Sequence, residues 1–332
     1  MPIAARPTLI RERAGAGHAS RSRSALLACL LLAGAVPASE AKTHYASFTY
    51  RQTSGTRPYV PVELNGTKLL FMVHANASFS AMTTHANAKK AGIGDLVPLG
   101  AYGITEPGKV SELGRAKAVA TRFVVGGRID KDLGILVFEI PQTPPVDGMI
   151  GIEWLNASKA LVDYRHDRLV LPESDQDVAA EHRRLREQGY AAHPMTWDAK
   201  EDRYYVFPTV NGAKSRFAVS TVASISIDTA FASRAGIALG PVVDHYGGPT
   251  GTTGDERETA EPFAIALDGQ RLQSVKAQSY DLYAYDGTER PSEASEIVDG
   301  YLGCDFMRAN DAVIDFGSGL LFTRPKTPAK HR

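Results

Sequence analysis

FMVHANASFS (71–80) and FAVSTVASIS (217–226) are two stretches of this 332-residue chain that align without a gap. In each, an apolar run typical of a buried strand ends at a polar residue, His74 in the first and Ser220 in the second. Ala-Ser follows three residues later in both stretches. The shared pattern predicts a strand that ends in a tight functional turn, and it occurs twice.

The similarity extends beyond these stretches and indicates an internal repeat. Residues 59–80 align with 205–226 at a shift of 146, and residues 146–171 align with 298–323 at a shift of 152. Two blocks in the same order and at similar shifts indicate a tandem duplication. The matched pairs include Asn65-Gly66 with Asn211-Gly212, Phe71 with Phe217, Asp147-Gly148 with Asp299-Gly300, and Gly151 with Gly303.

Each repeat is rich in strand and turn signals. Asn-Gly between apolar runs is a strong hairpin signal because both residues accept positive φ. The expected hairpin arms are Tyr59–Leu64 with Lys68–Val73, and Val206–Val210 with Phe217–Val219. Further strand-turn units are expected at 122–127 and 262–269, and short helices are expected to close at Ala91-Gly92-Ile93 and Ala235-Gly236-Ile237.

The composition argues against several kinds of partner. Lys+Arg and Asp+Glu both number 37, so the formal net charge is zero and a nucleic-acid partner is not expected. The nine histidines are scattered and show no ligand spacing, so we expect no metal and no cofactor. Cys304 would be the single cysteine after signal cleavage, and we expect it to be a buried free thiol.

Residues 1–41 have the pattern of a secretory signal peptide. A basic segment precedes the apolar run 25–36, and small residues follow, with cleavage expected after Ala38 or Ala41. Twelve apolar residues are too few to span a bilayer, which needs about 20. We therefore expect export to the periplasm or secretion, without a membrane span after cleavage. A lipoprotein anchored through Cys29 is the alternative.

The remaining segments define the expected domains. Residues 173–192 are dominated by charges, with a capping box at Ser174 and Asp177 and a stop at Gly189, so they predict a surface helix acting as a linker. The expected lobes are 42–172 and 193–325, and 326–332 is an expected disordered tail.

Together these features resemble the retropepsin-like aspartic proteases, over residues 57–171 and 203–323. The resemblance rests on the apolar strand, the loop with Ala-Ser, the helix ending near Gly-Ile, and Asp-Gly-apolar-apolar-Gly before a final strand pair. It implies an all-β fold with two β-barrel lobes in one chain, a pepsin-like pseudo-dimer that is monomeric and has a cleft between the lobes. In this family each lobe supplies Asp-Thr-Gly, and the two close carboxylates share a proton and activate a water.

The motif positions of this chain depart from that pattern. They hold His74, Ala75 and Asn76 in the first repeat and Ser220, Thr221 and Val222 in the second. Both catalytic aspartates are therefore absent, and the bracing threonine survives only as Thr221. If the loops need a left-handed residue, Asn76 tolerates that conformation but Val222 would be strained.

No nearby aspartate replaces the missing pair in the sequence. Asp228 lies only eight residues before Gly236, too close for the loop and helix that the pattern requires. Asp147 and Asp299 belong to the second aligned block, where a structural role is expected.

The resemblance and its departures predict an aspartic-protease-like protein that does not cleave peptides but keeps a cleft for an extended peptide or protein segment. The expected binding residues are His74 and Ser220 with residues of two flap hairpins, 101–110 and 246–253, represented by Tyr102, Gly103, Tyr246 and Gly247. The alternatives are an active peptidase or hydrolase with non-standard residues, for example a His74–Ser220 pair, and a structural or assembly protein of the envelope. A pH-sensing role of His74 is a further hypothesis.

Overall fold

The computed structural model describes residues 42–50, 57–102, 104–106, 109–140, 146–247, 252–273 and 275–324. The expected signal peptide, the expected tail and Gly103 lie outside the described residues. Within the described part of the chain, no helix is long and apolar enough to cross a membrane.

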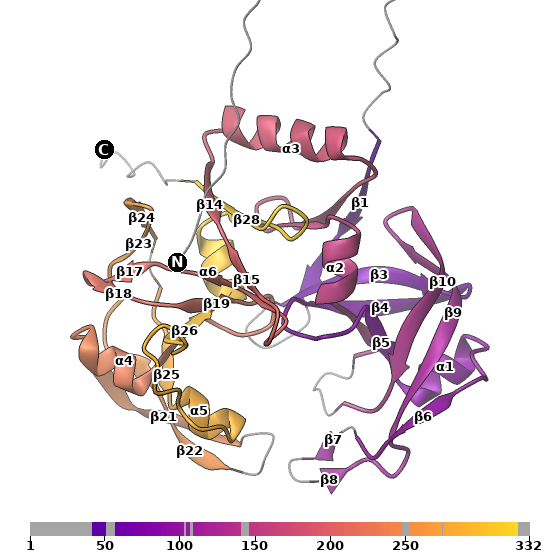
Figure 1. Ribbon diagram of the computed structural model, residues 1–332, viewed down its shortest axis with the longest axis horizontal. Coiled ribbons are helices and arrows are strands. Elements are labelled where there is room, and N and C mark those ends of the chain that lie inside the picture. Colours follow the sequence, from indigo (N-terminus) through magenta and orange to yellow (C-terminus); the bar gives the residue numbers. More distant parts are fainter. Residues whose placement is uncertain are drawn as a thin grey trace, which may run out of the picture. The chain divides into compact units, whose positions relative to one another are not determined.

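The first lobe is built on an eight-stranded sheet that closes on itself (Figure 1). Its strands, in spatial order, are β2 (Thr49–Tyr50), β3 (Pro58–Leu64), β4 (Thr67–His74), β11 (Gly148–Gly151), β5 (Ala81–Thr83), β10 (Arg128–Val137), β9 (Arg115–Val125) and β6 (Val97–Gly100). An additional pairing of β3 with β9 closes the barrel. The short pair β7 (Ile104–Glu106) and β8 (Lys109–Val110) stands apart from this sheet.

The second lobe has an eight-stranded sheet and a smaller one. The larger sheet contains, in spatial order, β15 (Thr196–Asp198), β16 (Arg203–Val206), β19 (Phe217–Val219), β26 (Gly300–Leu302), β20 (Ser226–Asp228), β25 (Gln278–Tyr280), β22 (Thr253–Thr259) and β21 (Leu239–Gly247). The smaller contains β18 (Ala213–Lys214), β17 (Thr209–Val210), β23 (Ile265–Leu267) and β24 (Gln270–Leu272).

The two large sheets share one strand pattern. In the first lobe β4 is parallel to β11, β11 antiparallel to β5, β5 parallel to β10, and β10 antiparallel to β9. In the second lobe β19, β26, β20, β25 and β22 follow the same alternation. The all-β, two-lobed architecture expected from the sequence is therefore confirmed.

The first predicted hairpin is confirmed, and the second is formed differently. Asn65 and Gly66 turn β3 into β4 with φ of 48° and 86°. Asn211 and Gly212 also have positive φ, but the strands next to that turn are the short β17 and β18. The expected arm 206–210 is interrupted at Pro208, which has no N–H for the ladder, so β16 pairs with β19 and β17 joins the smaller sheet.

A six-stranded sheet joins the two lobes. Its order is β1 (Thr43–Ser47), β13 (Arg168–Pro172), β12 (Leu161–Asp163), β27 (Val313–Asp315), β28 (Leu320–Thr323) and β14 (Ala191–Pro194). The strands β12 and β27, which come from the corresponding aligned blocks, pair antiparallel at its centre. The two repeats therefore share a continuous hydrogen-bonded structure.

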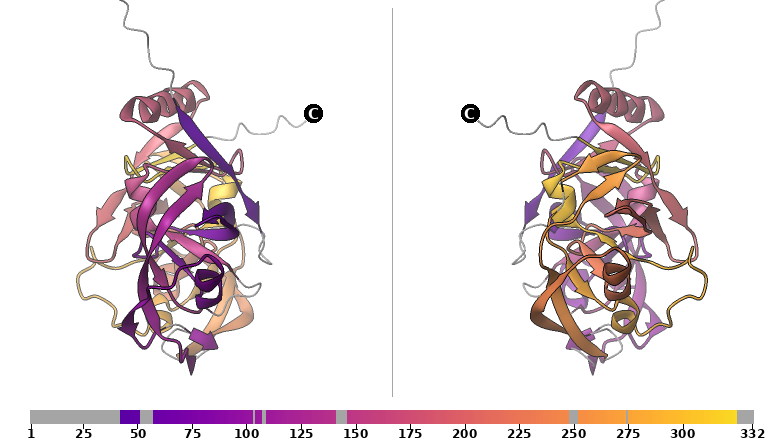
Figure 2. Two further views of the ribbon diagram at one scale, coloured as in Figure 1. Left: turned by 90° about the vertical axis from the view of Figure 1, so that its right-hand side faces the viewer. Right: turned by 90° about the vertical axis from the view of Figure 1, so that its left-hand side faces the viewer.

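The helix α3 (Asp175–Glu187) connects the lobes and is docked on this sheet. Its predicted capping box, between Ser174 and Asp177, is formed. His182 Nε2 lies 2.6 Å from the Asp315 carboxylate, and Arg184 lies 3.8 Å from that of Asp163. Both views of Figure 2 show α3 beside the end of β1. The linker is thus tied to two buried carboxylates and is more than a solvated connection.

The other helices are short. They are α1 (His85–Lys90), α2 (Ile152–Ala157), α4 (Thr229–Arg234), α5 (Leu282–Asp286) and α6 (Cys304–Ala309). The helices α1 and α4 end before Gly92 and Gly236, both with positive φ, as the two Ala-Gly-Ile signals predict.

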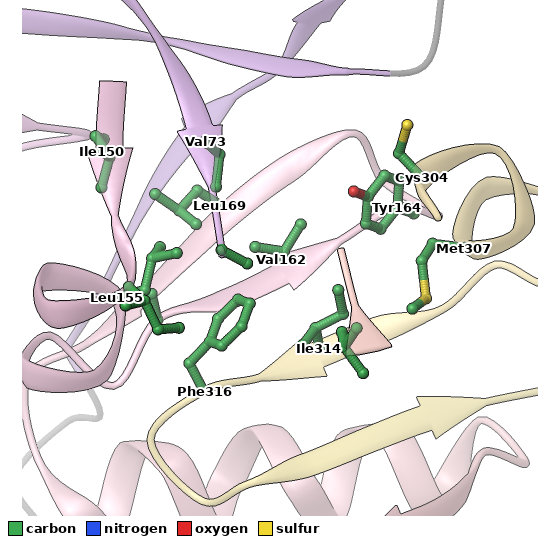
Figure 3. Packing of buried hydrophobic residues seen from close by; sticks show 14 of the residues in the cluster. Val73, Ile150, Leu155, Val162, Tyr164, Leu169, Cys304, Met307, Ile314 and Phe316 are labelled. Atoms are coloured by element: carbon green, nitrogen blue, oxygen red, sulfur yellow. The ribbon is translucent and has the colours of Figure 1, made fainter. Parts of the chain in front are cut away.

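One hydrophobic core runs through both lobes. Figure 3 shows Val73 and Ile150 of the first lobe in the same cluster as Met307 and Ile314 of the second. Cys304 is 1% exposed and its thiol donates to the carbonyl oxygen of Ala223 at 3.2 Å, so the expected buried free thiol is confirmed. Because the core is shared, the ends of β4 and β19 are held by packing as well as by hydrogen bonds.

Candidate functional site

The two motif loops begin where central strands of the two lobes end. β4 ends at His74, which stands opposite Gly151 of the parallel strand β11. β19 ends at Val219, and the next backbone N–H, that of Ser220, donates to Leu302 O at 3.1 Å. Each loop therefore follows a strand that is hydrogen-bonded to the strand of the Asp-Gly block in its own repeat, β11 in the first and β26 in the second.

Close packing against a glycine holds each loop in place. A Cβ added to Gly151 would lie 2.0 Å from the carbonyl oxygen of Phe79. One added to Gly303 would lie 2.2 Å from the carbonyl carbon of Ser224. The final glycine of Asp-Gly-apolar-apolar-Gly is thus explained in both repeats by the close approach of the motif loop.

The residues at the two aspartate positions bind their own loops. The N–H of Asn76 donates to His74 Nδ1 at 3.3 Å. In the second loop, Ser220 Oγ accepts from the N–H groups of Val222 at 3.2 Å and Ala223 at 3.0 Å. His74 and Ser220 therefore supply an acceptor for the amide two residues on, so the loop shape does not depend on a carboxylate.

Neither loop uses a left-handed residue at the motif's third position. Eight non-glycine residues have positive φ in the described part of the chain, and neither Asn76 nor Val222 is among them. The expected tolerance of Asn76 for that conformation is therefore not used, and Val222 carries no such strain.

Hydrogen bonds connect the two loops directly, and the second loop contributes a different side chain to them than the first. Thr221 Oγ1 donates to Val73 O at 2.7 Å and accepts from the N–H of Ala75 at 2.9 Å. Ala75 has no hydroxyl to return these bonds. Instead the side-chain amide of Asn76 donates to Val219 O at 3.0 Å. The bracing role of Thr221 is as the resemblance implies, whereas the compensating role of Asn76 was not predicted.

His74 borders a pocket of about 400 Å³. The described residues that line it are His74, Asn76, Ala77, Ser78, Phe79, Tyr102, Arg115, Leu136, Phe138, Ile140 and Met149. All of them belong to the first lobe, and none is Asp or Glu. Val222 of the second loop packs against a buried cluster to which the lining residues Met149 and Phe138 belong.

The environment of His74 favours its neutral form. Burial, with smaller contributions from the positive charges of Arg57 and Arg203, lowers the pKa of His74 to about 4. A neutral ring also fits the geometry, because Nδ1 accepts the N–H of Asn76 and so carries no proton there. His74 is consequently an uncharged residue near neutral pH.

Ser220 lies in a different setting from His74. It is 1% exposed, does not line the His74 pocket, and its Oγ accepts two backbone N–H groups. A serine nucleophile needs a general base at its hydroxyl and access to the substrate. Among the described residues no general base contacts the Ser220 hydroxyl, and Ser220 is buried, so the structure does not place it with His74 at the pocket.

The predicted flap residues separate into two places. Tyr102 is 48% exposed, lines the His74 pocket and contacts Phe138 edge-on, with ring centroids 5.1 Å apart. Tyr246 instead packs in an aromatic cluster with Tyr280 and Tyr285, with centroids 5.5 and 5.6 Å from its own. Gly247 ends β21, opposite Thr253 of β22. The structure therefore places Tyr102 in the pocket that His74 borders, whereas Tyr246 packs against other tyrosines of the second lobe.

Asp228, the aspartate that follows the second loop in the sequence, has a structural role. Asp228 is fully buried and caps α4, accepting from the N–H groups of Ala230 at 3.0 Å and Phe231 at 3.3 Å. Its second oxygen accepts from Arg290 at 2.8 Å and from the N–H of Leu282 at 3.3 Å. These partners occupy both oxygens, in keeping with its rejection as a catalytic residue.

Asp147 and Asp299 hold the strands that lead to the loops. Asp147 accepts from the N–H of Leu70 at 2.9 Å, and Asp299 accepts from the N–H of Arg216 at 3.0 Å. Leu70 and Arg216 are matched positions of the aligned repeats. The two carboxylates thus brace β4 and the strand segment before β19 in the same way, which is the structural role expected of them.

Arg115 is the site residue that sequence reasoning missed. It begins β9, and its guanidinium carbon lies 4.6 Å from the centre of the Tyr102 ring. Its position soon after the expected flap 101–110 is the only sequence signal that points to it. In the described residues, no group of three or more potential metal ligands comes together.

Comparisons with known proteins relate this geometry to solved structures. No family model matches the sequence, and no curated protein matches it. The aspartic proteinase from Irpex lacteus is similar over 88% of this chain and 100% of its own, with a TM-score of 0.50 and 11% sequence identity.

Two further solved structures are similar at lower TM-scores. Conglutin gamma, a basic 7S globulin from lupine seeds, matches 87% of this chain and 96% of its own, with a TM-score of 0.47 and 10% identity. A retropepsin-like aspartic protease from Rickettsia conorii matches 41% of this chain and 96% of its own, with a TM-score of 0.29 and 22% identity. The likeness to the Irpex lacteus enzyme, which covers that protein completely, shows that this chain has the fold of the aspartic proteases.

Proposed function

We propose that this chain is an exported protein that uses an aspartic-protease fold to bind peptides and does not cleave them. The observation that carries the proposal is the state of the two aspartate positions. Neither His74 nor Ser220 has a carboxylate. His74 Nδ1 and Ser220 Oγ each accept hydrogen bonds from backbone N–H groups of their own loop. In this view the chain arose by tandem duplication and later lost both motifs.

The proposed inability to cleave peptides follows from what an aspartic protease needs for this reaction. A shared proton between two carboxylates lets one act as acid and the other as base at the same pH. A neutral imidazole and a serine hydroxyl do not reproduce that pair. The described lining of the His74 pocket offers no other Asp or Glu, and Asp228 is committed to α4 and Arg290.

The features that support binding remain. The loops are held in place by Thr221 and Asn76, and a pocket with an apolar floor opens beside His74. A volume of about 400 Å³ lies within the range of small-ligand sites. A peptide segment would add main-chain hydrogen bonds to such a site while one side chain enters the pocket.

Export is the part of the proposal that rests on sequence alone, namely on the signal-peptide pattern of residues 1–41. The same pattern leaves open whether cleavage follows Ala38 or Ala41. The amino-terminal sequence of protein recovered from the periplasm or the medium tests this part separately from binding. A chain that stays in the cytoplasm with its first residues intact would overturn it.

The binding function is tested with the mature protein and a diverse peptide library between pH 3 and pH 8. Retained peptides and cleavage products are both identified by mass spectrometry. We expect retention of a subset of peptides and no cleavage at any pH in this range. Turnover that pepstatin inhibits would show an active protease, and a library recovered without retention would remove the binding function.

A further inference from the structure

The His74 pocket is lined by one positively charged side chain, that of Arg115, and no described residue supplies a negative charge to pair with it. Arg115 lines the pocket, and its buried Nε forms no hydrogen bond with the residues that the structure describes. No ion pair connects Arg115 to any residue in the described part of the chain. This contrasts with Arg122 on the same strand, which pairs with Glu63.

The arrangement of Arg115 prepares it for a planar anion. Its guanidinium lies over Tyr102, whose ring contacts Phe138. Stacking on an aromatic face limits the motion of the side chain while leaving its N–H donors available at the edges. Arginine binds carboxylates through two parallel hydrogen bonds, and such pairs are stronger when partly buried.

The rest of the pocket is suited to one apolar side chain. Five of the lining residues have apolar side chains larger than alanine: Phe79, Leu136, Phe138, Ile140 and Met149. The ligand that matches both features has a carboxylate next to an apolar group. The carboxy-terminal residue of a peptide has this chemistry, with its α-carboxylate and side chain on the same carbon.

The lost motif makes such a ligand electrostatically acceptable. An aspartate pair at these positions would repel a carboxylate brought beside it. Here both positions are uncharged, and Arg57 and Arg203 are near enough to His74 to act on its charge state. A chain end that an active dyad disfavours is therefore compatible with this pocket.

We propose that the His74 pocket binds the free carboxy terminus of a peptide whose last residue is apolar, with Arg115 holding the α-carboxylate. The inference rests on the proposed peptide-binding function and names the class of peptide. It distinguishes a chain end from the middle of an extended segment.

The test uses two pools of pentapeptides with random residues at the first four positions and Phe, Leu or Met at the fifth. One pool has free carboxylates and the other has carboxamides. The mature protein is incubated with each pool at pH 7, and retained peptides are counted by mass spectrometry. We expect at least about tenfold greater retention of the free acids, the usual scale for one charged hydrogen-bonded contact.

Variants assign this preference to Arg115. Arg115→Met should reduce retention of the acids to the level of the amides, and Arg115→Lys should restore part of the difference. Arg122→Met is the matched control on β9 and should keep the preference of the natural protein. A urea denaturation midpoint of R115M equal to that of the natural protein shows that the variant is folded.

The outcomes separate this inference from the function on which it rests. Equal retention of acids and amides, or a preference that survives in R115M, overturns carboxy-terminal recognition and leaves peptide binding in place. Retention of neither pool overturns both. N-acetylphenylalanine serves as a competitor, and complete displacement of the pentapeptides at equal concentration would assign the pocket to small carboxylic acids instead of peptides.

Discussion

The two motif loops of this molecule have the same position in the fold but face different surroundings. Both accept a backbone N–H at the former aspartate position, through His74 in the first loop and Ser220 in the second. His74 borders a pocket lined by Arg115, which forms no ion pair within the described part of the chain, whereas Ser220 is buried. The comparison teaches that an imidazole nitrogen and a hydroxyl oxygen can serve as the loop acceptor at equivalent positions of the fold, and that only the first of these positions borders the pocket.

The largest expected effect comes from the glycines behind both loops. Gly151→Ala and Gly303→Ala would each place a Cβ about 2 Å from loop backbone, and we expect each to lower the free energy of unfolding by at least about 3 kcal/mol. Urea denaturation measures both. Gly94→Ala, with no atom within 4 Å of the added Cβ, is the control and should change stability by less than about 0.5 kcal/mol. If Gly303→Ala left the stability unchanged while Gly151→Ala lowered it, the two loops would not be packed in equivalent ways.

Removal of the hydroxyl that bridges the loops should have the next largest effect. Thr221→Val leaves the buried N–H of Ala75 without its acceptor and Val73 O without its donor, at a cost of about 2–4 kcal/mol. Thr221→Ser keeps the oxygen and should lose much less. Equal stabilities of the Val and Ser variants would show that the bridge contributes nothing.

The charge of His74 predicts a dependence of stability on pH. The pKa of His74 is about 4 in the folded protein and about 6.5 in the unfolded chain, so only the unfolded chain takes up the proton as pH falls between these values. The resulting loss of stability reaches at most about 3 kcal/mol near pH 4 and then levels off. We expect His74→Gln to reduce this dependence in denaturant midpoints measured from pH 7 to pH 4. Parallel curves for the two proteins would contradict the low pKa.

The hydrogen bond from the Asn76 side chain to Val219 O should contribute less to the free energy of unfolding than the two hydrogen bonds of Thr221. Asn76→Ala removes the donor to Val219 O, but it also removes a buried amide oxygen that accepts no hydrogen bond from the described residues. The two effects oppose each other, so we expect a loss of about 1 kcal/mol or less in the same denaturation assay. A cost as large as that of Thr221→Val would show that Asn76 fully replaces a bracing threonine.

The smallest expected effect concerns catalysis. His74→Asp alone should produce no peptidase activity between pH 3 and pH 8, because Ser220 leaves the new carboxylate without a partner to share its proton. Cleavage of a fluorogenic peptide library is the measurement. Pepstatin-sensitive activity of the single variant would show that one carboxylate suffices and would contradict the proposal that the chain needs an aspartate pair for cleavage.

Some structural features could be predicted because they depend on neighbouring residues. The Asn65-Gly66 turn, the stop of α3 at Gly189 and its capping box at Ser174 follow from local backbone preferences. The second hairpin was only partly predicted, because Pro208 interrupts the arm expected over residues 206–210. Its missing N–H was a readable local signal.

The sequence by itself determined the repeated strand-loop-strand pattern and the absence of both motif aspartates, since these are properties of residue order. Only the tertiary structure decided that His74, Tyr102 and Arg115 line one pocket, that Asn76 reaches the other loop, and that Ser220 is buried. These outcomes depend on side chains brought together from distant strands. Their distances are set by the packing of two lobes around one shared core, which no local pattern encodes.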